Sequence, residues 1–326
     1  MVSSKKEVSS EFLPFLRVYK DGSVERFLDS PYVPPALEDP ATGVSSKDIT
    51  ISPGISARIY LPKLPTTTQK LPILAYFHGG AFCIESAFSF LSQRYISTLA
   101  SQAKVLVVSV EYRLAPENPI PTAYEDSWAA LQWIASHSSN DQNYKKEPWL
   151  LNHADFNRVF VGGDSSGANI AHNLSLRAGR ESLQGGMSIH GVLLSHPYFL
   201  SSKPISLEPS SDDDVDKNLL YKAWEFAYPN APGGFDNPLI NPFSNEAPSL
   251  SSLQCSRLLV CVAEKDELRE RGVRYFNAIK KSGWKGKVEL FEVEGEDHCF
   301  QIFDIERGNA KIMFKRLASF LSAPLN

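Results

Sequence analysis

The chain has 326 residues, of which 43% are hydrophobic and 21% are charged, a balance typical of a globular protein with a sizeable core. Its formal net charge is −4 and its basic residues are scattered, which argues against a protein that binds nucleic acid or an anionic membrane. The first twelve residues lack the apolar core of a signal peptide and no later segment is apolar enough to span a membrane, so we expect a cytoplasmic protein.

Residues 1–50 have an irregular pattern. Pro14 interrupts an apolar stretch, residues 21–22 (Asp-Gly) favour a turn, and residues 31–40 are rich in proline. We therefore expect no regular pair of strands in this segment. Instead, we expect it to fold over a main sheet formed by the rest of the chain.

After this segment, short β-branched runs alternate with amphipathic stretches. Strands are predicted at residues 71–77, 105–110, 159–161, 189–194, 258–262 and 288–293. Helices are predicted around Tyr124, Trp128 and Leu131, after Ala168, and over residues 267–281 and 306–321. This alternation predicts a single α/β domain over residues 1–326, with a mostly parallel central sheet flanked by helices.

Residues 197–252 interrupt the alternation and indicate an insertion after the strand at 189–194. They contain an acidic run at residues 212–214 and a loop at 229–242 that is rich in proline, glycine and asparagine. With residues 1–50 they predict a cap that would exclude water from a site; the alternative is a pair of surface excursions. The acidic run lacks the spacing of a calcium loop and predicts the solvated start of a helix.

A glycine-rich motif at residues 78–82 (His-Gly-Gly-Ala-Phe) follows the predicted strand at 71–77. Glycines let the backbone approach a ligand closely, and backbone N–H groups can stabilise the oxyanion that develops during acyl transfer. We therefore predict that the amides of Gly79 and Gly80 form part of an oxyanion hole. An ordinary glycine turn would be the better interpretation if the chain had no nucleophile.

The nucleophile is predicted at Ser165, within a G-x-S-x-G motif at residues 163–167. An apolar run precedes the motif and a helix-forming stretch follows it, which is the strand–turn–helix context of a nucleophile elbow. The elbow exposes the serine hydroxyl and adds the amide of Ser166 to the oxyanion hole. The two motifs together predict a serine hydrolase.

A serine nucleophile needs a histidine to take its proton and a carboxylate to orient that histidine. We predict His298, because it follows the last strand and lies downstream of a plausible acid. The other histidines after the motif lie within the elbow helix or beside the next strand: His172, His190 and His196.

The predicted acid is Asp266, which follows the strand at 258–262. Glu264 is the competitor by position, but it is closer to the strand and has a longer side chain. Asp297 is adjacent to His298 and is expected to be exposed. The triad is therefore predicted as Ser165, Asp266 and His298.

The four cysteines lack the paired spacing and the histidine clustering that zinc sites use: Cys83, Cys255, Cys261 and Cys299. We expect reduced thiols, no metal and no cofactor. Cys299 follows His298, but adjacent side chains usually point apart, so we expect it to be a small apolar residue and not a catalytic thiol.

These motifs resemble those of plant carboxylesterases of the hormone-sensitive-lipase type. The resemblance rests on residues 78–82, 112–117 (Tyr-Arg-Leu-Ala-Pro-Glu) and 163–167 with the Asp266/His298 pair, and it extends to 18–26 and 42–48. It covers nearly the whole chain. It implies an α/β-hydrolase fold and a cap built partly from the N-terminal segment.

Within that family, residues 149–156 and 231–234 are similar to those of 2-hydroxyisoflavanone dehydratases and of carboxylesterase-like alkaloid cyclases. Such dehydratases typically have threonine in place of Ser165, and the cyclases have tyrosine in place of His298. The related gibberellin receptors also lose this histidine. Because this chain retains both residues, the resemblance implies ester hydrolysis, with dehydration or elimination at the same site and a small-molecule receptor as the alternatives.

Aromatic residues near the predicted site suggest a pocket for apolar or aromatic groups, as in esters of plant secondary metabolites. Phe82, Tyr198 and Trp224 are the predicted substrate-binding residues. Others of the same kind lie nearby in the sequence: Phe88, Phe90, Phe199 and Phe226. The alternative for each is a place in the core. The only partner expected is a small-molecule ester.

Overall fold

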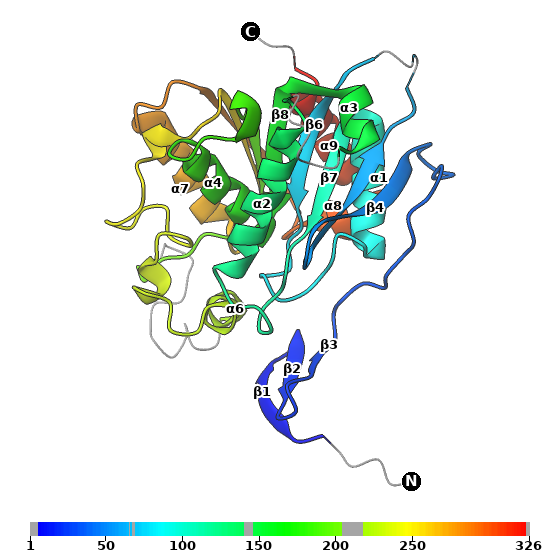
Figure 1. The fold of residues 1–326 in the computed structure, drawn as a ribbon. Coiled ribbons are helices and arrows are strands. Elements are labelled where there is room, and N and C mark those ends of the chain that lie inside the picture. Colours follow the sequence, from blue (N-terminus) through cyan, green and yellow to red (C-terminus); the bar gives the residue numbers. More distant parts are fainter. Residues whose placement is uncertain (1–5, 65, 67–68, 140–145, 204–217, 324–326) are drawn as a thin grey trace, which may run out of the picture.

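The computed structural model describes residues 6–64, 66, 69–139, 146–203 and 218–323. Its main feature is an eight-stranded sheet, which lies in the upper part of Figure 1. The spatial order of the strands is β11-β10-β9-β8-β6-β7-β5-β4. Strand β5 pairs antiparallel with β4 and with β7, and the other neighbours are parallel. The bounds are β4 Ser45–Ser52, β5 Ile55–Leu61, β6 Leu71–Phe77, β7 Leu106–Glu111, β8 Ala154–Asp164, β9 Gly191–Ser195, β10 Arg257–Ala263 and β11 Lys287–Val293.

Helices cover both faces of this sheet (Figure 1). Successive strand residues such as Ile73 and Leu74 belong to two different apolar cores, because side chains alternate between the faces of a strand. One core includes side chains of α2 (Thr122–Ser136), α4 (Ser166–Ala178) and α7 (Arg269–Lys281). The other includes side chains of α1 (Phe90–Ala103), α8 (Phe300–Phe303) and α9 (Gly308–Leu321). The other helices of the described ranges are α3 (Pro148–His153), α6 (Leu219–Ala227) and the 3₁₀ turns η1 (Gln184–Gly186), η2 (Gly234–Asp236) and η3 (Leu250–Ser252).

The structure confirms the α/β fold class and the six predicted strands. Strand β8 is longer than the apolar run 159–161. Its first half is mostly only partly buried and therefore contains polar residues, which gave no apolar signal in the sequence. The two C-terminal helices begin at Arg269 and Gly308, two residues after the predicted starts. Within the described ranges, no helix combines the length and the apolar character that crossing a membrane requires.

The N-terminal segment differs from the prediction. It forms a three-stranded antiparallel sheet of β1 (Val8–Phe12), β2 (Leu16–Tyr19) and β3 (Val24–Arg26), so the expectation of no regular strand pair is wrong. The breakers fall in the turns: Pro14 lies between β1 and β2, and Gly22, with a φ of 83°, lies between β2 and β3.

This small sheet lies apart from the main sheet, on the side of α6 (Figure 1), and residues 45–50 belong to the main sheet as part of β4. The expectation that residues 1–50 fold over a sheet formed by the rest of the chain is therefore wrong. The Phe12 ring stacks on the Phe226 ring of α6 with 5.6 Å between centroids. The N-terminal segment therefore contacts the 197–252 insertion, as a shared cap would require, and water exclusion by that cap remains a prediction. The acidic run 212–214 lies outside the described residues.

Candidate active site

Ser165 occupies a sharp turn between β8 and α4. Its backbone has φ 51° and ψ −117°, a conformation that non-glycine residues rarely adopt. Its N–H donates to the carbonyl of Ser195 at 2.9 Å, and its carbonyl accepts from the amides of Asn169 and Tyr198. A Cβ on Gly167 would lie 1.9 Å from the carbonyl oxygen of Phe77, so this glycine lets the elbow approach the end of β6. The turn is thus fixed on three sides.

Asp266 and His298 follow the neighbouring parallel strands β10 and β11. Because parallel strands bring their carboxyl ends to one edge of a sheet, the two residues meet there: His298 Nδ1 lies 2.8 Å from Asp266 Oδ2. A carboxylate only accepts, so Nδ1 carries the proton and Nε2 is left as the basic nitrogen. This pairing is the one predicted from the sequence.

The pKa values of this pair shift in the directions that a triad needs. Burial opposes charge on both groups, but the facing imidazole and the hydrogen bonds lower the pKa of Asp266 below its usual range. Burial likewise disfavours the imidazolium form of His298, and the Asp266 carboxylate outweighs it and raises the pKa of His298 above its ordinary value of 6.5. The acid therefore stays ionised while the histidine can accept a proton.

The rejected acids lie elsewhere. Glu264 is exposed and accepts from the amide of Gly295 at 2.7 Å. Asp297 is exposed, as expected, and its carboxylate accepts from the backbone N–H of His298. In the structure, neither carboxylate contacts the ring of His298.

His196 is a residue of this site that the sequence interpretation missed. It follows β9, between the nucleophile strand and the acid strand, and its Nδ1 lies 3.1 Å from the same Asp266 oxygen that His298 uses. Its Nε2 faces Gln301 Oε1 at 3.1 Å, and its side chain is fully buried. Its position at the carboxyl end of a predicted strand was the available signal.

His196, Asp266 and His298 also place their ligand atoms within 4.8 Å of one another, as a metal site would. However, the Nδ1 atoms of His196 and His298 already donate to the Asp266 carboxylate, so a metal would have to displace both of these hydrogen bonds. The donor set fits a proton relay better than a metal site, and the expected absence of a metal remains a prediction.

The glycine-rich loop after β6 contains the predicted oxyanion donors. The amide of Gly79 donates to Asp164 Oδ2 at 3.1 Å, so it already has an acceptor, and its role as an oxyanion donor stays a prediction that this hydrogen bond does not favour. Within the described part of the chain, no acceptor faces the amides of Gly80 and Ala81. The amides that could serve as donors are therefore those of Gly80 and Ala81, with Ser166 at the start of α4. The motif spacing alone gave no sign that Ala81 belongs to this set.

Asp164 joins this loop to the nucleophile and to the histidine loop. Its buried carboxylate accepts from the Tyr76 hydroxyl as well as from Gly79, and burial raises the pKa of this carboxyl. The Cys299 thiol lies 3.9 Å from Asp164 Oδ2. The residue before Ser165 is thus in contact with the residue after His298, which places the elbow beside the histidine loop.

The hydroxyl of Ser165 makes no hydrogen bond with any described residue. Catalytic hydrogen bonds are often long without substrate and shorten in the reacting complex, so a Ser165–His298 bond remains a prediction. The serine residue is largely buried, with 9% of its surface exposed, whereas the His298 side chain is 32% exposed.

The aromatic residues predicted to bind substrate lie in the core. Phe82, Tyr198 and Trp224 are each at most 1% exposed, and the rings of Tyr198 and Trp224 lie 6.1 and 6.3 Å from that of Phe82. The Trp224 Nε1 donates to the Gly234 carbonyl. These side chains pack against one another and present no surface to a substrate here, so their role in substrate binding is not supported.

All four cysteines are free thiols. Burial raises the pKa of the Cys299 thiol well above its usual value, with Asp164 and Asp266 adding to the effect. Cys299 is therefore a neutral thiol that packs behind the elbow, in line with the sequence interpretation.

Comparison with known proteins agrees with this geometry. A family model described as alpha/beta hydrolase fold matches residues 74–302, and the chain belongs to this family. It is 59% identical over 322 residues to a 2-hydroxyisoflavanone dehydratase of Glycyrrhiza echinata, with 98% of each chain covered. It is 46% identical over 324 residues to a protein named probable carboxylesterase 2 of Arabidopsis thaliana, with 99% of each covered.

Among solved structures, a hyperthermophilic esterase from the archaeon Pyrobaculum calidifontis superposes with a TM-score of 0.68 at 29% identity, covering 85% of each chain. The relatives confirm the predicted resemblance to plant carboxylesterases of the hormone-sensitive-lipase type. The protein is an esterase-type alpha/beta hydrolase.

Proposed function

We propose that the protein is a serine carboxylesterase that hydrolyses small carboxylic esters through an acyl-enzyme. The observation that carries the proposal is the 2.8 Å hydrogen bond from His298 to Asp266, at the same sheet edge as the strained Ser165 turn. A histidine held in this tautomer keeps Nε2 free to take a proton from a serine.

In the first half of the reaction, Ser165 Oγ attacks the ester carbonyl and its proton passes to His298 Nε2. The carbonyl oxygen becomes an oxyanion that the amides of Gly80, Ala81 and Ser166 stabilise. The bond to the alcohol oxygen then breaks, and the alcohol leaves with the proton from His298.

In the second half, His298 takes a proton from water as the water oxygen attacks the acyl carbon. The bond to Ser165 Oγ breaks, the carboxylic acid leaves and the serine recovers its proton. Asp266 remains ionised throughout and stabilises the imidazolium form of His298.

Esters of plant secondary metabolites are the proposed substrates. The relatives from plants support this class, and the intact pair of Ser165 and His298 supports ester hydrolysis as the reaction. The acyl and alcohol preferences are best read from a panel in which chain length and aromatic groups vary independently.

The alternative is a dehydratase or a related elimination enzyme at the same site. The 59% identical relative is named a 2-hydroxyisoflavanone dehydratase, and this similarity favours the alternative. In that reaction, His298 would act as a general base while the oxyanion donors polarise a ketone, without any covalent bond to Ser165.

The test compares purified wild type with Ser165→Ala, His298→Ala and Asp266→Asn on short p-nitrophenyl esters. A loss of turnover of about 10³-fold or more in the first two variants supports the esterase. Mass spectrometry after treatment with an organophosphate should show one adduct, on Ser165. Negligible turnover by folded wild type, or turnover that Ser165→Ala leaves unchanged, rejects the proposal; consumption of a 2-hydroxyisoflavanone by Ser165→Ala would then establish the alternative.

A further inference from the structure

The loop that carries the oxyanion donors has an unfavourable backbone. Three of its non-glycine residues adopt left-handed conformations: Ala81 with φ 54°, Phe82 with φ 63° and Glu85 with φ 68°. Such conformations cost free energy and persist only where surrounding contacts fix them. The contacts around this loop therefore determine whether its amides point at a substrate.

Some of these contacts come from the elbow and from the loop itself. The amide of Phe82 donates to Ser166 Oγ at 3.3 Å, and the amides of Cys83 and Ile84 donate to the carbonyl of Gly80. These bonds fix the inner side of the loop.

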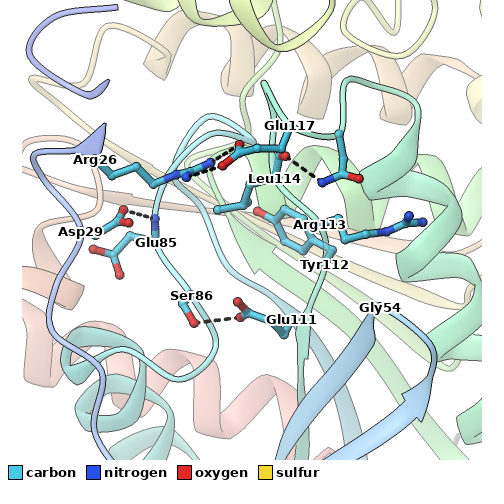
Figure 2. Close-up of a pocket in the computed structure, with 11 residues that line it drawn as sticks. Arg26, Asp29, Gly54, Glu85, Ser86, Glu111, Tyr112, Arg113, Leu114 and Glu117 are labelled. Carbon is cyan, nitrogen blue, oxygen red and sulfur yellow. Dashed lines mark hydrogen bonds and ion pairs between the residues drawn. The ribbon is translucent and has the colours of Figure 1, made fainter. Parts of the chain in front are cut away.

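The outer side of the loop is held by Arg26, the last residue of β3. Its Nε donates to the carbonyl of Cys83 at 2.7 Å and its Nη2 to the carbonyl of Ala115 at 3.1 Å. Both terminal nitrogens also bond the carboxylate of Glu117, at 2.9 and 2.7 Å (Figure 2). One planar guanidinium thus bonds three acceptor groups at once, two carbonyls and one carboxylate.

Ala115 connects this arrangement directly to the strained loop. Its amide donates to the carbonyl of Phe82 at 2.9 Å, while its own carbonyl accepts from Arg26. Arg26 therefore fixes Phe82 through Ala115 and fixes Cys83 directly. These bonds also give a role to the segment 112–117, which the catalytic steps do not use.

Residues just after Arg26 hold the next part of the loop. Asp29 Oδ1 accepts from the amide of Glu85 at 2.8 Å (Figure 2), and the amide of Ser30 donates to the Glu85 carboxylate at 3.0 Å. The N-terminal segment therefore contacts the loop on both sides of Ile84.

We propose that Arg26 is a positioning residue for the oxyanion hole, so that the N-terminal segment is a working part of the active site. Arg26 contacts no reacting atom; it acts through the backbone of Cys83 and Ala115, which sets the direction of the Gly80 and Ala81 amides. The proposal rests on the proposed function, because ester hydrolysis reports on the oxyanion hole.

The side chain has the properties that such a role requires. It is only 16% exposed and its charge is paired with Glu117, so its position is defined. Lysine could keep the charge pair, but a single ammonium lacks the planar fork that reaches two carbonyls and a carboxylate together. Arg26→Lys therefore keeps the positive charge beside Glu117 and removes the hydrogen bonds that depend on the planar guanidinium.

The experiment compares Arg26→Ala and Arg26→Lys with wild type and with Arg17→Ala. Arg17 is the matched control: it lies in the same small sheet, pairs with Glu11 and has no hydrogen bond to the loop. Steady-state hydrolysis of p-nitrophenyl acetate gives kcat and KM, thermal unfolding gives Tm, and inhibition by an alkyl trifluoromethyl ketone measures binding of a tetrahedral oxyanion.

We expect Arg26→Ala to lower kcat about 10- to 100-fold while KM changes less than about threefold, because an oxyanion contact is made mainly in the transition state. The affinity for the trifluoromethyl ketone should fall by about the same factor as kcat/KM. Arg26→Lys should lower kcat about 3- to 10-fold at an unchanged Tm. Arg17→Ala should retain wild-type kcat and inhibitor affinity.

The pocket beside Arg26 allows a rescue experiment. It has a volume of about 530 Å³ and is lined by Asp29, Glu85, Glu111 and Glu117 among others (Figure 2). Guanidinium ions at millimolar concentration should therefore enter the space left in Arg26→Ala and restore part of kcat, whereas ammonium at the same ionic strength should not.

The proposal is overturned if Arg26→Lys and any folded Arg26→Ala protein keep kcat and inhibitor affinity within about twofold of wild type. It is also overturned if Arg17→Ala loses activity to the same extent, since the effect would then be general destabilisation. If Arg26→Ala does not fold, Arg26→Lys alone decides between these outcomes. A wild type without esterase turnover would instead reject the proposed function.

Discussion

Replacing Asp266 by asparagine should abolish most of the activity while leaving the fold intact. Asp266 Oδ1 accepts from the amide of Leu268 at 2.8 Å, and Oδ2 accepts from both His298 and His196. Asparagine offers one oxygen and one NH₂ group in place of the two oxygens. The NH₂ group of the asparagine must therefore face either the Leu268 amide or the two histidine Nδ1 atoms, all of which are donors.

The magnitude follows from which set loses its acceptor. If the NH₂ group faces the histidines, His298 must move its proton to Nε2, the nitrogen that should accept the proton of Ser165. A triad with this wrong tautomer loses about 10⁴-fold in kcat, or about 5.4 kcal/mol of transition-state stabilisation. If the oxygen faces the histidines, His298 keeps its tautomer, but the neutral amide no longer stabilises the imidazolium form, so activity still falls. The Leu268 amide then loses its acceptor at a cost of about 1–3 kcal/mol in stability.

The assay is kcat/KM on p-nitrophenyl acetate, with Tm and far-UV circular dichroism as controls for folding. Asp297→Asn is the matched variant, because Asp297 is adjacent to His298 and contacts its backbone but not its ring. It should stay within about threefold of wild type, because surface substitutions away from such contacts have small effects. The reasoning fails if Asp266→Asn keeps more than about a tenth of wild-type activity, or if Asp297→Asn loses as much as Asp266→Asn.

Three further predictions concern pH, the oxyanion loop and the thiol. Because the pKa of His298 is raised above 6.5 and the base acts when neutral, kcat/KM should fall as the pH drops through a midpoint above 6.5, and a midpoint at or below 6.5 in the pH profile would contradict this. Gly80→Ala places a Cβ 2.2 Å from the carbonyl oxygen of Ile84 at a φ of 102°, so kcat should fall by at least about 100-fold, and near-normal kinetics would be a contradiction. Cys299→Ala should keep kcat within about threefold and iodoacetamide should not inactivate the native enzyme, because the buried thiol is neutral; rapid inactivation would reverse this conclusion.

Local sequence predicted the scaffold of the site well. Strand β6 is a continuous apolar run because helices cover both of its faces. Such a run can be recognised from the sequence without knowledge of the tertiary structure. The Asp266–His298 pair was predictable because each residue lies in the loop after a strand, and parallel strands bring their carboxyl ends together. Chain order therefore carried the spatial information.

Contacts between distant segments were not predictable in this way. The Gly79 amide is occupied by a carboxylate 85 residues further along the chain, and His196 meets Asp266 across 70 residues. Neither pairing has a local signal. The N-terminal strands were missed for a related reason, since Pro14 looks like a breaker until the register shows that it lies in a turn. Phe82 likewise has the same local appearance in a core as in a pocket.

The order of the strands has a consequence for the protein as it is synthesised. Ser165, His196, Asp266 and His298 follow four strands, β8, β9, β10 and β11, which are adjacent in space in the same order as they leave the ribosome. Each group reaches the site only after the one before it has been made. Under the proposed mechanism, a nascent or prematurely terminated chain that ends before His298 therefore carries Ser165 without its base, and Ser165 becomes active only after His298 has been made.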